Sequence, residues 1–345
     1  MTVSDGGRER RGGQRSSPFF ATCPAGLGRV LRAQLAGITG VEITDRGTDG
    51  ESDYALFEAD AGGRAQALRS RLADGVFADA GRAERAGSTD PYVLAARCWR
   101  PEPVQRALSV WAEQVRPLTA AMTYQVQTRM QTGPRSLRSG LRGALADVIG
   151  SGRPKWRASA AGQLEIWLAE WRASQLVTGL RLAGNRAGPA DGPDTLPPAV
   201  AAALVYLAGD RRGVLLDPCC GRGEILGQAV AAGWTAEGTD PDPERLAAAQ
   251  RAAPAAVARQ GDADEILAAD ATVDACVTRV PADRAPAWLD AALAELSRVT
   301  RSGGAVVALA ADIPRAAIPP ALRLRRQVPV QLAAGRAYAW VFHRA

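Results

Sequence analysis

The sequence predicts an α/β protein in which a doubly wound sheet follows a smaller α+β region. Residues 213–240 have the pattern of a strand, a glycine-containing turn, a helix and a second strand. Strand-like and helix-like segments then alternate to the C-terminus, which is typical of a doubly wound sheet. Residues 19–80 show the order β-α-β-β-α-β, which predicts a small ferredoxin-like domain in front of it.

Composition bounds the class of protein. The 345 residues are 47% hydrophobic and 23% charged, enough for a sizeable core and two or three domains. The five cysteines form no C-x-x-C pair and there is one histidine, so we expect no zinc site and no disulfide framework. We find no apolar run of membrane-spanning length and no signal peptide. We therefore expect a cytoplasmic monomer without a metal or membrane partner.

The first two segments follow from local pattern. Residues 1–17 are rich in Gly, Arg and Ser without apolar periodicity, which predicts a disordered tail. Its arginines leave open a weak electrostatic contact with RNA. Residues 18–92 form the ferredoxin-like domain. We expect strands at 19–23, 41–45, 54–58 and 76–80, with one helix opening at Pro24 and another at 65–72.

The middle segment, residues 93–186, holds the basic excess of the chain. It carries fourteen bases against five acids, whereas residues 187–345 carry sixteen against eighteen. Such a segment points to a polyanion partner, and a solvated arginine face is the plainer alternative. We expect helices at 104–115 and 135–149 and strands at 123–130, 164–170 and 175–182. The candidate RNA-binding residues are Arg135, Arg138, Arg142, Arg153, Lys155 and Arg157. Three tryptophans, Trp156, Trp167 and Trp171, are expected in the core rather than as platforms for base stacking.

A linker at 187–198, rich in Gly, Pro and Asp, precedes a domain at 199–345. This domain should open with a helix at 199–207. Gly221 and Gly223 supply the turn after the first strand, where a ligand can approach the backbone and the helix N-terminus. Asp217 ends that strand and Asp240 ends the next, about 20 residues past the turn, where a carboxylate can hold ribose hydroxyls.

The run Asp217-Pro218-Cys219-Cys220-Gly221-Arg222-Gly223 resembles motif I of class I S-adenosylmethionine methyltransferases. It looks like the branch that methylates exocyclic amines of nucleic-acid bases. The resemblance implies a Rossmann-like fold and S-adenosyl-L-methionine as cofactor, with Cys219 at the first glycine place. It also implies that Asp262, after the third strand, accepts the adenine amino group.

A second resemblance covers nearly everything from Phe19 onward. The run Phe19-Phe20-Ala21-Thr22-Cys23-Pro24 is similar to the start of THUMP-containing RNA methyltransferases. Gln163-Leu164-Glu165-Ile166-Trp167 and Gly179-Leu180-Arg181-Leu182 are similar to later parts of that family. The resemblance implies that residues 93–186 form a THUMP-like RNA-binding domain and that RNA, as the acceptor end of tRNA, is the partner. It also implies methylation of guanine N2.

The loop after the fourth strand, residues 278–284, is the expected methyl-acceptor site. Enzymes of this branch carry N-P-P-Y or N-L-P-F there, whereas this chain reads T-R-V-P-A-D-R. Pro281 is retained, but Arg279 stands at the Asn place and Ala282 at the aromatic place. Arg279 is a donor with no acceptor. Three explanations are open: the acceptor site has drifted and leaves little activity, Asp283 accepts the amine hydrogens instead, or the substrate is a different one. The candidate catalytic residues are Arg279, Pro281 and Asp283.

Three functions therefore remain open. The first is an S-adenosylmethionine-dependent RNA methyltransferase acting on guanine N2 in tRNA. The second is a catalytically weak or inactive RNA-binding protein that retains the methyltransferase fold. The third is a small-molecule methyltransferase, which is disfavoured because such an enzyme does not need so basic a segment.

Overall fold

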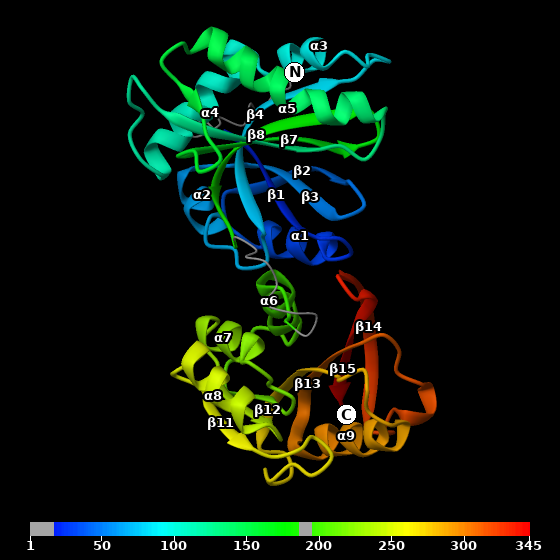
Figure 1. The fold of residues 1–345 in the computed structure, drawn as a ribbon. Coiled ribbons are helices and arrows are strands. Elements are labelled where there is room, and N and C mark those ends of the chain that lie inside the picture. The colour runs from blue at the N-terminus through cyan, green and yellow to red at the C-terminus, as the bar shows by residue number, and fades with distance from the viewer. Residues whose placement is uncertain (1–16, 186–194) are drawn as a thin grey trace, which may run out of the picture.

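The computed structural model describes residues 17–185 and 195–345, which form two α/β halves (Figure 1). Residues 1–16 of the predicted tail and most of the predicted linker lie outside the described residues, whereas Ser17, assigned to the tail, is the first residue of β1. The strands of the N-terminal half are β1 Ser17–Pro24, β2 Val41–Thr48, β3 Ser52–Ala59, β4 Gly75–Glu84, β5 Thr123–Arg129, β6 Arg157–Ala158, β7 Leu164–Arg172 and β8 Gln175–Ala183. Its helices are α1 Gly28–Ala36, α2 Ala61–Ala67, α3 Pro91–Cys98, α4 Pro101–Gln114 and α5 Arg135–Gly152.

The N-terminal half contains the predicted β-α-β-β-α-β order, but its helices differ from those expected. Helix α1 begins at Gly28 and not at Pro24, because Pro24 is the last residue of β1. Helix α2 ends at Ala67, five residues before the expected end. Helix α2 begins four residues earlier than expected, because the Asp60 side chain accepts a hydrogen bond from the Gly63 N–H and caps it. Helix α3 was not predicted, although Asp90 caps it and Pro91 opens it. The proposed boundary between residues 92 and 93 falls within this helix.

All eight N-terminal strands belong to one sheet, in the order β2-β3-β1-β4-β8-β7-β5-β6. The link is the antiparallel pairing of β4 with β8. A large cluster of buried residues packs the helices on one face of this sheet and continues into the C-terminal half. A smaller cluster, which includes Phe20, Phe77 and Trp171, fills the other face. Trp156 and Trp171 are buried, and Trp167 is partly buried, so they are core residues as predicted.

The C-terminal half is a seven-stranded sheet in the order β11-β10-β9-β12-β13-β15-β14. Strands β9 to β13 are parallel, and the last hairpin pairs antiparallel to them. The strands are β9 Val214–Asp217, β10 Thr235–Asp240, β11 Val257–Gln260, β12 Val273–Arg279, β13 Thr300–Ala310, β14 Leu322–Leu332 and β15 Gly335–Arg344. The helices are α6 Pro198–Leu207, α7 Glu224–Ala231, α8 Pro243–Ala252, α9 Pro286–Val299 and the short 3-10 turn Arg315–Ala317. The predicted doubly wound sheet is confirmed.

The chain order of the strands reverses between β9 and β12, because β10 lies on one side of β9 and β12 on the other. In an open parallel sheet, ligands bind outside the carboxyl ends of the strands at such a reversal. The fold therefore places a site at the ends of β9, β10 and β12. None of the described helices is both long and apolar enough to cross a membrane.

Figure 1 shows the tip of the β14–β15 hairpin and α6 at the junction of the two halves, and α7 also contacts the N-terminal half. The Gln331 N–H donates to the Ala25 carbonyl at 2.9 Å. Gly26, at φ +96°, lies so close to β14 that an added Cβ would sit 2.2 Å from the Pro329 carbonyl oxygen. The Arg71 guanidinium donates to the Gln228 side chain at 2.6 Å. These contacts fix the N-terminal half against the end of the C-terminal sheet at which the site lies.

Candidate active site

The turn between β9 and α7 forms the floor of the site. Gly221 and Gly223 both take left-handed conformations, at φ +52° and +88°. An added Cβ at Gly223 would sit 2.9 Å from the Cα of Ala249 in α8, whereas at Gly221 the surroundings are open. Gly223 is therefore required by packing, since it caps α7 against α8. Gly221 leaves the backbone accessible to a ligand.

Asp240 ties the second strand to this turn. Its Oδ2 accepts the Gly221 N–H at 3.0 Å, and its Oδ1 accepts the Asp242 N–H at 3.0 Å. The residue is only 4% exposed. The predicted ribose-binding carboxylate thus also holds the shape of the glycine turn.

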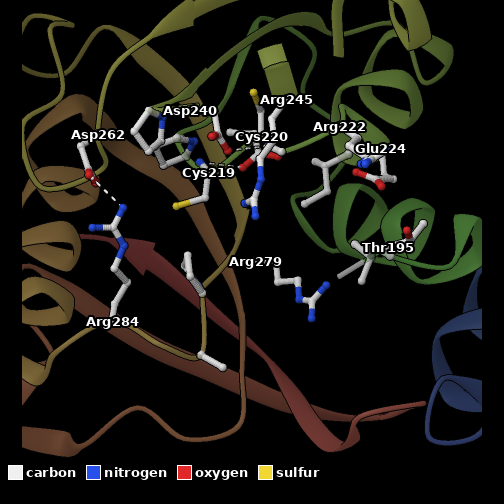
Figure 2. Close-up of a pocket in the computed structure, with 18 of the residues that line it drawn as sticks. Thr195, Cys219, Cys220, Arg222, Glu224, Asp240, Arg245, Asp262, Arg279 and Arg284 are labelled. Atoms are coloured by element: carbon white, nitrogen blue, oxygen red, sulfur yellow. Dashed lines mark hydrogen bonds and ion pairs between the residues drawn. The ribbon is translucent and has the colours of Figure 1, made fainter. Parts of the chain in front are cut away.

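Asp262 is held by partners from residues 278–284, which we call the acceptor loop, and from α9. Its Oδ2 accepts the Arg284 guanidinium at 3.0 Å, and its Oδ1 accepts the Trp288 indole N–H at 2.9 Å. Figure 2 shows the contact between Arg284 and Asp262 spanning one side of the site. Partial burial opposes ionisation of Asp262, but these hydrogen bonds and the Arg284 charge outweigh it and keep the pKa of the carboxyl below its usual value.

One pocket of about 840 Å³ collects most of the predicted site residues (Figure 2). Pockets of 300–1,000 Å³ are typical of small-molecule and cofactor sites. The predicted cofactor-binding residues that line it are Asp217, Cys219, Gly221, Asp240 and Asp262. The predicted catalytic residues Arg279, Pro281 and Asp283 line the same pocket. Gly223 is not on its wall.

Burial sets the ionisation of the innermost groups. Asp217 is 1% exposed, and its burial raises the pKa of its carboxyl to about 7. Burial and the neighbouring Asp217 likewise raise the pKa of the Cys219 thiol, so this sulfur is not an activated nucleophile. The floor of the pocket therefore offers hydrogen-bond acceptors and backbone N–H groups rather than a nucleophile.

Several pocket residues were not found from sequence. Thr195, Leu196, Arg222, Glu224 and Arg245 also line the cavity. Trp288 comes from the first turn of α9 and reaches Asp262 from there. Its position in an ordinary amphipathic helix gives no signal of this contact, because the pairing depends on how α9 packs. Figure 2 places Arg279 on the side of the pocket near Thr195, away from Asp262.

The predicted RNA-binding residues lie in two places in the N-terminal half. Arg135, Arg138 and Arg142 are exposed along α5. Arg153 is partly buried, with its guanidinium 5.0 Å from the Trp156 ring centre and 3.2 Å from the Gln105 side chain. Lys155 and Arg157 are exposed beyond it. Arg153 thus also stabilises packing, whereas the α5 arginines are available to a ligand.

Comparison with known proteins agrees with this geometry. Residues 215–304 match the family model of a methyltransferase domain. That segment contains the glycine turn, Asp240, Asp262 and the acceptor loop. The match and the pocket together support S-adenosylmethionine as the cofactor.

Two solved structures share the fold of nearly the whole chain. TrmN from Thermus thermophilus is 20% identical, with a TM-score of 0.72 over 95% of this chain and 99% of its own. A possible methylase from Clostridium difficile is 13% identical, with a TM-score of 0.68 over 96% of this chain and 99% of its own. No curated protein matches the sequence. The arrangement of a doubly wound sheet behind an eight-stranded N-terminal half is therefore found in other proteins.

Proposed function

We propose that this protein is an S-adenosylmethionine-dependent RNA methyltransferase that acts on guanine N2 in tRNA. The observation that carries the proposal is the shared pocket: residues suited to a cofactor and the acceptor loop face one cavity. The exposed arginines of α5 favour RNA over a small molecule as the substrate. The likeness to TrmN over nearly the whole chain supports tRNA as that RNA. The division into a ferredoxin-like domain, a THUMP-like domain and a methyltransferase domain is part of this proposal.

Within the pocket each group would have a separate task. Asp240 would accept the ribose hydroxyls and Asp262 the adenine amino group, while the open backbone at Gly221 would admit the methionine part. When bound, the cofactor supplies an electrophilic methyl group. The acceptor loop would align the amine nitrogen with this methyl group, and the proton that the nitrogen gives up would pass to an acceptor there or to water. Chemistry of this kind depends mainly on in-line geometry.

The acceptor loop decides how well the amine is held. The nitrogen of guanine N2 is conjugated into the ring, so an acceptor for its hydrogens should favour the more tetrahedral nitrogen that attacks. Arg279 cannot accept a hydrogen bond, and Ala282 offers no ring for stacking. Asp283 lines the pocket and has carboxylate oxygens for this task. We therefore assign the acceptor role to Asp283 and a phosphate contact to Arg279.

Arg279 and Ala282 equally favour a second candidate, an RNA-binding protein that keeps the cofactor pocket without methyl transfer. The two candidates differ in one measurement. Single-turnover methyl transfer to an unmodified tRNA transcript, followed by nucleoside mass spectrometry, should yield N2-methylguanosine. Binding of both cofactor and tRNA without any methylated nucleoside would refute the enzyme and favour the second candidate.

The N-terminal contact with RNA has its own test. Arg138→Gln with Arg142→Gln should weaken tRNA binding and lower the slope of log affinity against log salt by roughly 1–2, because about 0.7–0.9 of a counterion is released per phosphate contact. Arg106→Gln is the matched control, since Arg106 is exposed on α4 but paired with Glu102 at 3.3 Å. An equal loss in the control and the double variant would contradict a specific role for α5.

A further inference from the structure

Charge is unevenly distributed within the C-terminal half, although its total is close to neutral. No acidic residue follows Asp312, and residues 313–345 contain six arginines. Residues 187–312 hold ten arginines against eighteen acids. The near-neutral sum of the whole half therefore hides one acidic part and one strongly basic part.

The basic part is largely the β14–β15 hairpin at one edge of the sheet. Strand β14 pairs with β15 on one side and is the last strand in the sheet order. Residues 323–327, Arg-Leu-Arg-Arg-Gln, are all exposed, and so is His343, which pairs with Arg323 across the hairpin. The register of the hairpin shifts between Leu324 and Arg326, so Arg325 has no opposite residue in β15. We call this cluster of Arg323, Arg325, Arg326 and His343 the hairpin surface.

The arginines of the hairpin surface differ in their partners from other arginines of the C-terminal half. Among the described residues, Arg323, Arg325 and Arg326 make no ion pair, whereas Arg284, Arg298 and Arg301 of the same half each pair with a carboxylate. The effect reaches His343: partial burial and the charges of Arg325 and Arg326 lower the pKa of its imidazole. Charged side chains also protect an edge strand from pairing with another chain, but acids would serve that purpose as well. Protection of the edge strand therefore does not explain why all the charges of the hairpin surface are positive.

We propose that the hairpin surface binds backbone phosphates of the same RNA that is held by α5. The inference rests on the proposed function and adds a contact made by the catalytic half itself. Figure 1 shows α5 and β14 in different halves of the molecule, so a ligand that reaches both must be extended. A polynucleotide is both extended and polyanionic. The hairpin tip is fixed to the N-terminal half by the bond from Gln331 to Ala25, so the two basic surfaces are held at a defined separation.

The single histidine makes the test direct. In protein without an added histidine tag, the imidazole signals in an NMR spectrum belong to His343 alone. Saturation with an unmodified tRNA transcript should shift these signals and raise the pKa of His343, because phosphates offset the charges of Arg325 and Arg326. Signals that stay unchanged while fluorescence anisotropy reports full tRNA binding would overturn the inference and leave the proposed function intact.

Affinity gives a second, independent measurement. The triple variant Arg323→Gln, Arg325→Gln, Arg326→Gln should lower tRNA affinity at least tenfold at moderate salt and reduce the salt slope by roughly 2–3. In this variant the His343 pKa of the free protein should rise, and tRNA should no longer shift it. Arg259→Gln is the control, since Arg259 lies on β11 at the opposite edge of the same sheet and pairs with Glu237 at 3.8 Å. A triple variant that binds like the control overturns the inference. Absence of tRNA binding by the wild type refutes the proposed function and this inference with it.

Discussion

Asp217 should make the stability of this protein fall as pH rises toward neutrality, and Asp217→Asn should remove that fall. Burial raises the pKa of Asp217 to about 7, against 3.8 for the free side chain. A carboxyl whose pKa is raised by folding contributes most stability when it is protonated, below pH 4. That contribution is lost as pH rises from 4 through 7. A difference of about three pKa units corresponds to a loss of about 4 kcal/mol in the free energy of unfolding.

The measurement is a comparison of urea unfolding of the wild type and Asp217→Asn between pH 4 and pH 8. The difference in unfolding free energy between them should change by about 4 kcal/mol in favour of the variant, because Asn is neutral throughout and keeps an oxygen for the Cys219 N–H. Other groups, including Asp74 with a raised pKa of about 6, contribute equally to both proteins and cancel. Asp290→Asn, at an exposed position of α9, controls for a general change of charge. A difference that does not vary with pH would refute the assignment of a buried, protonatable carboxyl at the end of β9.

Three further predictions concern the pocket and the glycine turn beside it. Asp240→Ala should weaken S-adenosylmethionine binding in calorimetry by roughly 1–3 kcal/mol, since it leaves ligand hydroxyls and the Gly221 N–H unpaired; unchanged affinity would exclude Asp240 from the site. Gly223→Ala should lower the free energy of unfolding by about 1–2 kcal/mol because of the left-handed backbone alone. The clash of the new Cβ with Ala249 should lower it further. The control Gly227→Ala, in open space on α7, should not destabilise the fold. If Asp283 accepts the hydrogen bonds of the amine, Asp283→Ala should abolish single-turnover methyl transfer, and Arg279→Asn with Ala282→Phe should lower its rate. A rise of about 10²–10³ in rate for the double variant would instead show that the Asn and aromatic places still govern the reaction.

The elements of the fold were largely predictable because each depends on local pattern. Alternation of apolar and polar residues located β2 and β3, and the glycine turn located the start of α7. The joining of β4 to β8 was not predictable, since the paired residues are about a hundred positions apart and many pairings suit their apolar faces. Helix α3 was missed although Asp90 and Pro91 are a common helix start, so the sequence did contain the signal for this helix.

The residues of the site also fall into those that local sequence spacing predicts and those that only tertiary packing brings there. Asp217, Gly221 and Asp240 were found because they belong to one continuous strand–turn–helix–strand unit, whose spacing fixes their relative positions. Trp288 was missed because it reaches Asp262 only through the packing of α9. Thr195 was missed because it reaches the pocket only through the packing of the segment before α6. The basic hairpin was missed for a third reason. A net charge summed over residues 187–345 cancels opposite signs that folding keeps apart.

The contact between Asp262 and Arg284 changes how the acceptor loop should be understood. Arg284 ends the loop that carries Arg279, Pro281 and Asp283, and its guanidinium is bound to the carboxylate expected to hold the adenine. The Arg284 side chain also lies over the Trp288 ring, with 5.0 Å from guanidinium to ring centre. The loop is therefore anchored on the Asp262 side of the pocket, while Arg279 lies on the side of Thr195 (Figure 2). Because one end of the loop is bound to Asp262, the residue proposed to hold the adenine, substitutions in the loop and at Asp262 should not be additive. Residues that share partners in one hydrogen-bonded network couple energetically.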